Sequence, residues 1–211
     1  MSIIRKTSIL ESLFNFKSEP IILDLPDAEI IYYPQFFDKE QADKIYTELL
    51  QEIAWQQDTI TIYGKTHPQP RLTALYGNEG KPYSYSNITM HPQPWNTLLQ
   101  KIKYYIEATT ECQFTTVLLN QYRDGKDSNG WHADNEKELG DNPIIASLSF
   151  GAERVFQLKH NTIVDAKKSI TLEHGSLLLM KGSTQHFWKH QIPKTAKPVD
   201  TRINLTFRTI E

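Results

Sequence analysis

The sequence predicts an α+β domain built on a β-sandwich or jelly roll. Two segments with helical periodicity lie in the first half of the chain, whereas almost everything from Phe114 onward has the pattern of strands and turns. No long alternation of strand and helix, the mark of a parallel sheet, is present in the sequence. At 211 residues, with 39% hydrophobic residues, the chain is long enough for one substantial core, so we expect a single domain.

Both expected helices have a recognisable start. The first follows Asp38, because Asp38-Lys39-Glu40-Gln41 resembles a capping box. Its apolar residues then recur at helical spacing, at Ala42, Ile45, Leu49 and Ile53. The second helix follows Pro92 and Pro94. Its apolar stripe consists of Leu98, Leu99, Ile102, Tyr105 and Ile106.

The remaining segments favour strands. Residues 58–91 are rich in Thr, Tyr, Ile, Pro and Gly, which is typical of short strands and turns. The run 124–130 has the composition of a turn that leads into a further strand. Neither an internal repeat nor a low-complexity linker divides the chain. The order of elements is therefore helices early and many strands late, as in an α+β domain.

Composition limits the classes of function and location. The net charge of −2 gives no overall nucleic-acid signature, so any contact with phosphate groups must come from a local patch. Cys112 is the single cysteine, which excludes a disulfide within the chain and indicates a reducing compartment. Charged residues interrupt the apolar residues near the N-terminus, and no run is long enough to cross a bilayer. We expect a cytoplasmic monomer with no membrane contact.

One polar row stands out near the C-terminus. Successive side chains of a strand face opposite ways, so one face of 202–208 carries Arg202, Asn204, Thr206 and Arg208. Inside a jelly roll this row would need a ligand or mutual hydrogen bonds. The alternative is an edge strand with a solvated face, and periodicity alone does not separate the two. A second strand has the same parity and also ends in polar groups, at Thr116, Leu118, Asn120 and Tyr122.

A candidate metal site lies at Trp131-His132-Ala133-Asp134. In an extended segment His132 and Asp134 project from the same side, so an imidazole and a carboxylate can reach one metal. Two histidines with one carboxylate are the set that holds Fe(II) on one face and leaves the other open. Chemistry alone leaves the third ligand ambiguous, because His186 and His190 share strand parity. For His67, His91, His160 and His174 we expect surface or hydrogen-bonded roles.

An open ferrous site needs a co-substrate before it meets O2. The guanidinium groups of Arg202 and Arg208 are permanently cationic planar forks, which suit a dicarboxylate such as 2-oxoglutarate. These residues therefore predict an oxygenase.

Several runs together resemble the AlkB family of Fe(II)- and 2-oxoglutarate-dependent dioxygenases, which repair alkylated nucleobases. The resemblance extends in order from about residue 55 to the end. It is carried by the runs Asn120–Asp127, Trp131–Asp134, Pro143–Ala152, His174–Leu178 and Arg202–Arg208. It implies a double-stranded β-helix, that is a jelly-roll core, with flanking helices and a nucleotide-recognition lid. The implied parts of the single catalytic domain are an N-terminal extension and helix (about 1–54), the lid (about 55–91) and the core (about 112–211).

Carried over position by position, the resemblance implies that His132, Asp134 and His190 hold the iron. It selects His190 over His186, because His190 occupies the motif position before Gln-Ile-Pro-Lys. The implied 2-oxoglutarate site consists of Asn120, Tyr122, Arg202, Asn204, Thr206 and Arg208. Within it Arg202 would anchor the distal carboxylate and Arg208 would lie near the metal.

The resemblance also assigns roles in the lid. Ile62-Tyr63-Gly64-Lys65 resembles a hairpin whose aromatic finger fills the gap left by a flipped base, and the finger here would be Tyr63. We expect Lys65 and Arg71 to brace the opened nucleic-acid backbone. Tyr83 and Tyr85 would embrace the flipped base beside Glu136. Asn135 is a departure, because many relatives carry an acid at this position, and it bears on substrate preference.

The implied reaction is oxidative demethylation of N-alkylated bases in DNA. Succinate and CO2 form from 2-oxoglutarate, and the oxidised methyl group leaves as formaldehyde. Cationic lesions of the 1-methyladenine and 3-methylcytosine type would suit tyrosine faces with Glu136 at hand. The alternatives are RNA demethylation, hydroxylation of another substrate such as protein, and a nucleic-acid-binding module without catalysis. The intact ligand set argues against the last of these.

Overall fold

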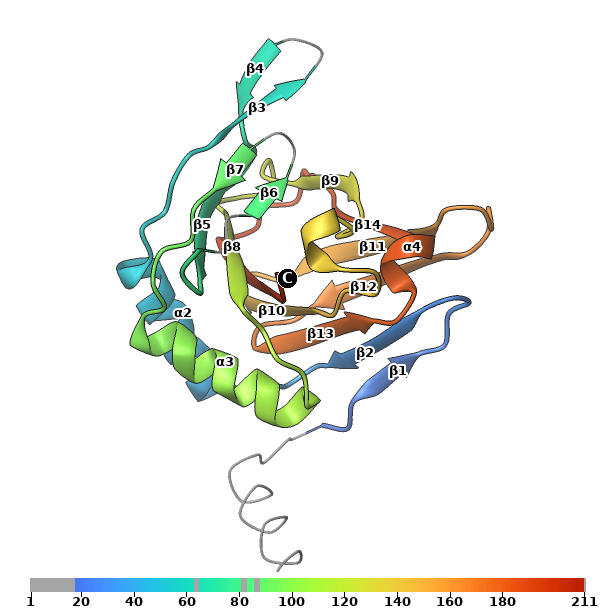
Figure 1. The fold of residues 1–211 in the computed structure, drawn as a ribbon, viewed down its shortest axis with the longest axis horizontal. Coiled ribbons are helices and arrows are strands. Elements are labelled where there is room, and N and C mark those ends of the chain that lie inside the picture. Colours follow the sequence, from blue (N-terminus) through green and yellow to red (C-terminus); the bar gives the residue numbers. More distant parts are fainter. Residues whose placement is uncertain (1–17, 63–64, 81–82, 86–87, 211) are drawn as a thin grey trace, which may run out of the picture.

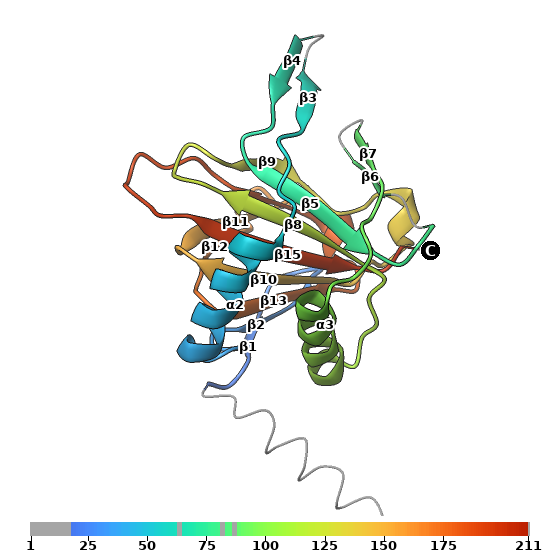
Figure 2. The same ribbon diagram turned by 90° about the vertical axis from the view of Figure 1, so that its left-hand side faces the viewer.

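The computed structural model describes residues 18–62, 65–80, 83–85 and 88–210. In this part of the chain two antiparallel sheets pack face to face, and the longer helices lie on the outer face of the larger sheet (Figures 1 and 2). No helix in the described residues is long and apolar enough to span a membrane. The combination of antiparallel sheets with few helices confirms the predicted α+β class.

The larger sheet has seven strands in the order β1-β2-β13-β10-β15-β8-β5. Its strands are β1 (Ile21–Leu23), β2 (Glu29–Tyr33), β5 (Leu72–Gly77), β8 (Thr116–Tyr122), β10 (Ile145–Gly151), β13 (Ser176–Lys181) and β15 (Arg202–Arg208). Because β1, β2 and β5 belong to it, this sheet extends beyond the range 112–211 that we expected for the core. The strand β15 is an interior strand of this sheet, flanked by β10 and β8. The solvated edge strand considered for 202–208 is therefore excluded.

The smaller sheet has four strands in the order β12-β11-β14-β9. Its strands are β9 (Asn129–His132), β11 (Arg154–His160), β12 (Lys167–Leu172) and β14 (Trp188–Ile192). Phe156, Leu158 and Trp188 from this sheet pack with Leu118 and Met180 from the larger one in a single buried cluster. The space between the sheets is thus partly filled by apolar side chains and partly left for polar ones.

The two long helices are the predicted ones. Helix α2 (Lys39–Glu52) starts with the expected capping box, in which Asp38 accepts a hydrogen bond from the Gln41 amide and Gln41 reaches back to Asp38. Helix α3 (Thr97–Thr110) is capped by Asn96, which accepts from the Leu99 amide. Their buried faces pack against the outward residues of β15, namely Ile203, Leu205 and Phe207. This packing fixes which face of β15 turns toward the smaller sheet.

Two short hairpins occupy the region predicted to form strands and turns. One consists of β3 (Thr59–Ile62) and β4 (Lys65–Pro68), and the other of β6 (Tyr83–Tyr85) and β7 (Ile88–Met90). Both project beyond the sheets on the side where β9 lies (Figure 1). A 3-10 turn η1 (Lys137–Leu139) and the short helix α4 (Thr184–Phe187) interrupt the strands of the second half.

Candidate active site

A cavity of about 110 Å³ lies between the two sheets. A single water needs only about 10–15 Å³ on this scale, so the cavity has room for a molecule of several heavy atoms. Eleven of the predicted site residues line it, from both sheets and the connecting loops. They are Arg71, Asn120, Tyr122, His132, Asp134, Glu136, His190, Arg202, Asn204, Thr206 and Arg208.

His132, Asp134 and His190 meet at one end of this cavity. One potential ligand atom from each lies within 4.8 Å of the others. The sheet explains the arrangement, because His132 at the end of β9 is the direct cross-strand partner of His190 on β14. Asp134 follows two residues after His132, in the extended segment that leaves β9. Its backbone N–H donates to Oε1 of the buried Gln185 at 2.9 Å, which fixes the segment. The three side chains are suited to hold a metal ion.

The three groups have protonation states that suit a cation. Burial lowers the pKa of His190 to about 3, so its ring is neutral at neutral pH. Burial also lowers the pKa of His132. Burial alone would raise the pKa of the Asp134 carboxyl, but the charges of Arg208 and the histidines hold it at about 2. Two neutral imidazoles beside an ionised carboxylate are the forms that coordinate a divalent metal.

Hydrogen bonds orient the ring of His132. Its Nδ1 lies 2.7 Å from the Gly130 carbonyl oxygen, so Nδ1 carries the proton and donates it to that oxygen. Nε2 is then the lone-pair atom of the ring, and the Asn129 amide donates to it at 3.2 Å. The same Nε2 is therefore the atom available to a metal.

The polar row of β15 forms the floor of the cavity. Asn204 donates from Nδ2 to Ser147 Oγ and to the Leu148 carbonyl oxygen, both at 2.8 Å. Thr206 in turn donates to Asn204 Oδ1 at 3.0 Å. These bonds account for part of the polar row within the protein itself, as the parity of the strand predicts.

Arg202 is different, because its guanidinium is 1% exposed and only partly paired. Nη2 donates to Ser149 Oγ at 2.8 Å, and the group lies 5.2 Å from the centre of the Tyr122 ring. Its Nε and Nη1 are buried and have no hydrogen-bond acceptor in the described residues. Burial lowers the pKa of Arg202 to about 10, so the group stays cationic at neutral pH. A buried cation with two unused donors is costly unless an anion fills the cavity.

Arg71 occupies a position that differs from the prediction. We expected it on the lid, bracing a nucleic-acid backbone, but its side chain is 5% exposed and lines the cavity. Nε donates to Asn120 Oδ1 at 2.7 Å, and Nη1 donates to the Ser128 carbonyl oxygen at 3.2 Å. Arg71 comes only three residues after the end of the exposed strand β4. The local sequence pattern therefore did not indicate that the chain turns inward at this position. Arg71 holds Asn120 in the cavity wall instead.

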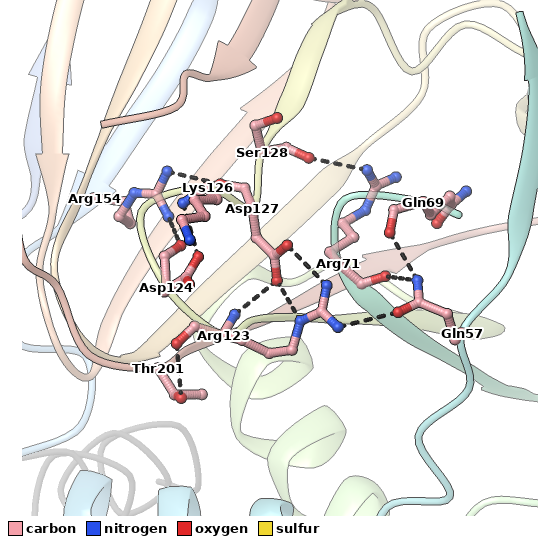
Figure 3. Close-up of polar contacts among 10 residues, drawn as sticks. All are labelled: Gln57, Gln69, Arg71, Arg123, Asp124, Lys126, Asp127, Ser128, Arg154 and Thr201. Atoms are coloured by element: carbon pink, nitrogen blue, oxygen red, sulfur yellow. Dashed lines mark hydrogen bonds and ion pairs between the residues drawn. The ribbon is translucent and has the colours of Figure 1, made fainter. Parts of the chain in front are cut away.

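A polar network joins the base of the β3–β4 hairpin to the loop before β9 (Figure 3). Asp127 accepts three hydrogen bonds from Arg123, through its backbone N, Nε and Nη2, at 2.8–2.9 Å. Nη1 of Arg123 donates to Gln57 Oε1 at 3.1 Å, and Gln57 donates to the Gln69 and Arg71 carbonyl oxygens. The loop that leads to His132 is therefore tied to both ends of the hairpin.

The structure describes some of the remaining predicted substrate residues fully, some only in their backbone and one not at all. Tyr63 lies outside the described residues. Tyr83 and Tyr85 lie on β6, although their side chains are outside the description. Lys65 is exposed on β4. Asn135 is exposed after Asp134, whereas Glu136 is half-buried and lines the cavity.

The ambiguity between the two downstream histidines is resolved by their positions. His186 lies on α4 with an exposed side chain, and its Nε2 contacts the Asp141 carbonyl oxygen, away from the His132 cluster. His190 is buried within the cluster. His160 and His174 have the hydrogen-bonded roles expected for them, with Asp27 and Asp43 respectively.

Several cavity residues were not predicted from the sequence. Ser147 and Ser149 on β10 accept hydrogen bonds from Asn204 and Arg202 respectively. Their spacing of two residues along a strand could have indicated that they face the cavity. Phe156 stacks on His190 with ring centres 5.1 Å apart. The alternation of apolar and polar residues along β11 could have indicated that Phe156 faces inward. Gln185, which holds Asp134, sits on a short helix that no pattern marked.

Known proteins are similar to this chain in sequence and in fold. The family described as the 2OG-Fe(II) oxygenase superfamily matches residues 29–208. Human alpha-ketoglutarate-dependent dioxygenase alkB homolog 3 is 45% identical over 193 residues, which cover 87% of this chain and 66% of that protein. Human DNA oxidative demethylase ALKBH2 is 38% identical over 188 residues, covering 84% of this chain and 72% of that protein.

Length and fold similarity complete the comparison. The chain spans 64–66% of the length of the alkB homolog 3 proteins from human, mouse, rat and cow. The solved structure of OsALKBH1 has a TM-score of 0.65 at 16% identity and covers 90% of this chain and 100% of that one. At that identity the likeness concerns the fold alone.

Proposed function

Because this chain belongs to the AlkB family of 2OG-Fe(II) oxygenases, we propose that it oxidatively demethylates N-alkylated bases in DNA. The observation that carries the proposal is one cavity that joins a His-Asp-His cluster to a buried, incompletely paired arginine. The cluster suits Fe(II) and the arginine suits the carboxylate of 2-oxoglutarate. The interpretation of the two sheets as a double-stranded β-helix, with the hairpins β3–β4 and β6–β7 as the lid, belongs to the same proposal.

The ligand set fits the iron that the family uses. In this proposal His132 offers Nε2, His190 its ring nitrogen and Asp134 one carboxylate oxygen, and the remaining positions stay open. Arg208 holds the other carboxylate oxygen, Oδ1, at 2.8 Å and so keeps Asp134 ionised and oriented. In this proposal Arg208 would act beside the metal by way of Asp134.

The polar row fits 2-oxoglutarate. Arg202 would bind the distal carboxylate with its unused Nε and Nη1, since a guanidinium and a carboxylate match as paired planar groups. Asn120, Tyr122, Asn204 and Thr206 would contact the rest of the co-substrate from the adjoining wall. Ser147 and Ser149 support this wall from β10.

The chemistry divides between the bound groups and the chain. Iron with 2-oxoglutarate and O2, when bound, supplies oxidation of an N-methyl C–H bond, with succinate and CO2 as co-products and formaldehyde leaving the base. The protein binds, orients and excludes water. Glu136, half-buried at the cavity, would attract a cationic base such as 1-methyladenine or 3-methylcytosine, and Tyr83 and Tyr85 would stack on it.

An experiment separates this proposal from its alternatives. One methylated sequence is offered as single-stranded DNA, duplex DNA and RNA, beside a methylated peptide, and formaldehyde and succinate are measured with and without Fe(II). We expect iron-dependent formaldehyde release, highest on DNA. Preference for RNA or peptide would support the other hydroxylase readings. Absence of succinate formation on every substrate would leave only the non-catalytic binding module.

The monomeric state and cytoplasmic location stay predictions from the sequence.

A further inference from the structure

The outer face of the smaller sheet carries a row of lysines that the proposed chemistry does not use. Lys167, Lys159 and Lys189 lie side by side on β12, β11 and β14, because Lys159 is the direct cross-strand partner of both others. Residues directly opposite in an antiparallel pair share a face of the sheet. We call these three residues the lysine row.

The lysine row borders a hollow in the surface. A hollow of about 310 Å³ is lined by the lysine row together with Asn161, Thr162 and Val164 from the connection between β11 and β12. None of the three lysines forms an ion pair with any residue in the described ranges. Like charges directly opposite on a sheet are destabilising. The row therefore carries like-charge repulsion that no ion pair within the described residues offsets.

Trp131 extends the basic surface toward the active site. Its side chain is 38% exposed on β9, and Nζ of Lys159 lies 4.4 Å from the centre of its ring. A cation over an indole ring is attracted to it and is held in place. Lys159 is thus directed across β14 toward β9, which is the edge strand of the smaller sheet.

The strands that carry this surface also carry the proposed metal ligands. Trp131 precedes His132 on β9, and Lys189 precedes His190 on β14. Neighbouring side chains of a strand point to opposite faces, so the surface lies on the reverse of the cavity wall. Asn129 and His132 of the edge strand β9 line the cavity, so a nucleic-acid strand that inserts one base past β9 would place its flanking nucleotides next to this outer face. Figure 1 shows β9, β14 and β11 adjacent on this side of the molecule, away from α2 and α3.

We infer that the lysine row with Trp131 is a second nucleic-acid contact, which binds backbone phosphates of the nucleotides that flank the flipped base. This inference rests on the proposed function for its choice of partner. The net charge of the chain is −2, so binding of a polyanion requires a local basic surface of this kind. Phosphate contacts of this type position a nucleic acid and carry no base specificity.

The test measures binding rather than turnover. The full chain is titrated with a fluorescently labelled, unmethylated single-stranded oligodeoxynucleotide over a series of salt concentrations. In Lys159→Gln/Lys189→Gln the slope of log K against log salt should fall by about 1.4, because each lost contact on a single strand removes about 0.7. Adding Lys167→Gln should lower the slope further. Removal of like-charge repulsion should leave the melting temperature equal to or above that of the wild type, which excludes misfolding.

The matched control is Lys44→Gln/Lys101→Gln, which removes the same charge from the groove between α2 and α3. We expect the control to keep the wild-type slope. An unchanged slope in the lysine-row variant, or an equal fall in the control, would overturn the inference. Polyglutamate is the competitor, and equal competition at the lysine row would overturn the nucleic-acid assignment in favour of an acidic protein partner.

Failure of the proposed function is visible separately. Suppose that the wild type releases no formaldehyde from methylated oligonucleotides, while the lysine-row variant binds the oligonucleotide more weakly and with a smaller salt slope than the wild type. The demethylase proposal is then wrong and the contact surface stands. If formaldehyde is released and the variant binds like the wild type, the contact surface is wrong and the demethylase proposal stands.

Discussion

Nη2 of Arg208 donates a hydrogen bond to Oδ1 of Asp134 across 2.8 Å, and each side chain is 5% exposed. The second oxygen, Oδ2, lies 3.9 Å from Nε2 of His190. One oxygen of the carboxylate is thus occupied by an arginine, while the other faces the histidine pair. The Arg208–Asp134 ion pair therefore defines which carboxylate oxygen is free for a metal.

The metal-ligand proposal is tested by substitution. His132→Ala, His190→Ala and Asp134→Asn should each abolish iron-dependent succinate formation, because each removes one of three protein ligands. His186→Ala is the control and should keep most of the activity, since His186 lies outside the cluster. Bound metal is measured in the same variants. Equal loss in His186→Ala with survival in His190→Ala would contradict the assignment.

Asp134→Asn is preferred to Asp134→Ala for a physical reason. Removal of one partner of a buried ion pair leaves the other charge uncompensated, at a cost of about 3–5 kcal/mol. Both substitutions remove the charge that compensates Arg208, but Asp134→Ala also removes every side-chain acceptor for it and so confounds loss of the ligand with loss of the fold more strongly. The amide keeps the shape and one acceptor for Arg208.

Arg202 is tested by a substitution that keeps its charge. Arg202→Lys retains a cation but loses the planar fork, so the 2-oxoglutarate concentration for half-maximal rate should rise by about tenfold or more, since one charge-assisted hydrogen bond contributes about 1.5–3 kcal/mol. Nucleic-acid affinity should stay nearly unchanged. The control is Arg154→Lys, because the guanidinium of Arg154 donates to three backbone carbonyl oxygens and does not line the cavity. An unchanged 2-oxoglutarate requirement in Arg202→Lys would exclude it as the anchor.

The sequence predicted local structure well where periodicity and packing agree. The capping box at Asp38 and the alternating faces of 202–208 follow from neighbouring residues, and both are present in the structure. Side-chain chemistry and strand parity did not decide between His186 and His190, because the choice depends on the register of β14 against β9, and only the family resemblance selected His190. The buried position of Arg71 likewise did not follow from its neighbours, since its partner Asn120 lies 49 positions away. Long-range pairing decides such positions, and local patterns do not encode it.

The stability of the metal-free protein should depend on pH through His190. Its folded pKa is lowered by burial from 6.5 to about 3, so the unfolded state binds a proton that the folded state does not. Stability is therefore complete above the unfolded pKa and falls as the pH decreases from about 6.5 toward 3, by up to about 1.4 kcal/mol per pH unit. Denaturant unfolding between pH 7 and pH 5 measures this slope. His190→Gln should reduce this slope, whereas substitution of the exposed His91 by Gln should not.

Asp127 should influence the metal site from a distance. It is 5% exposed and holds the loop before β9 through three hydrogen bonds from Arg123. Burial alone would raise its pKa, but these hydrogen bonds hold the pKa of the carboxyl below its usual value. Asp127→Asn loosens the segment that ends at His132, so the affinity for Fe(II) should fall by about 10-fold to 100-fold.

The control for Asp127 lies in the same loop. Asp124 accepts a hydrogen bond only from the Lys126 amide among the described contacts of its side chain. Asp124→Asn should keep the wild-type metal affinity. Similar losses in both variants would mean that general loosening of the loop, and not the Arg123 contacts, controls the site.

The predicted finger residue is tested by the form of the substrate. Opening a duplex costs unpairing and unstacking energy of a few kcal/mol, and a side chain that fills the vacancy recovers part of it. Single strands need no such help. If Tyr63 fills the vacancy, Tyr63→Ala should depress formaldehyde release from duplex DNA far more than from single-stranded DNA of the same sequence. Tyr104→Ala is the control, because Tyr104 is 64% exposed on α3, and it should change neither rate. Lys65→Gln should show losses that depend on salt, as expected for an exposed phosphate contact. Arg71→Gln should not, because the buried Arg71 holds Asn120. Equal losses of Tyr63→Ala on both substrates would make Tyr63 a packing residue and remove the support for duplex repair.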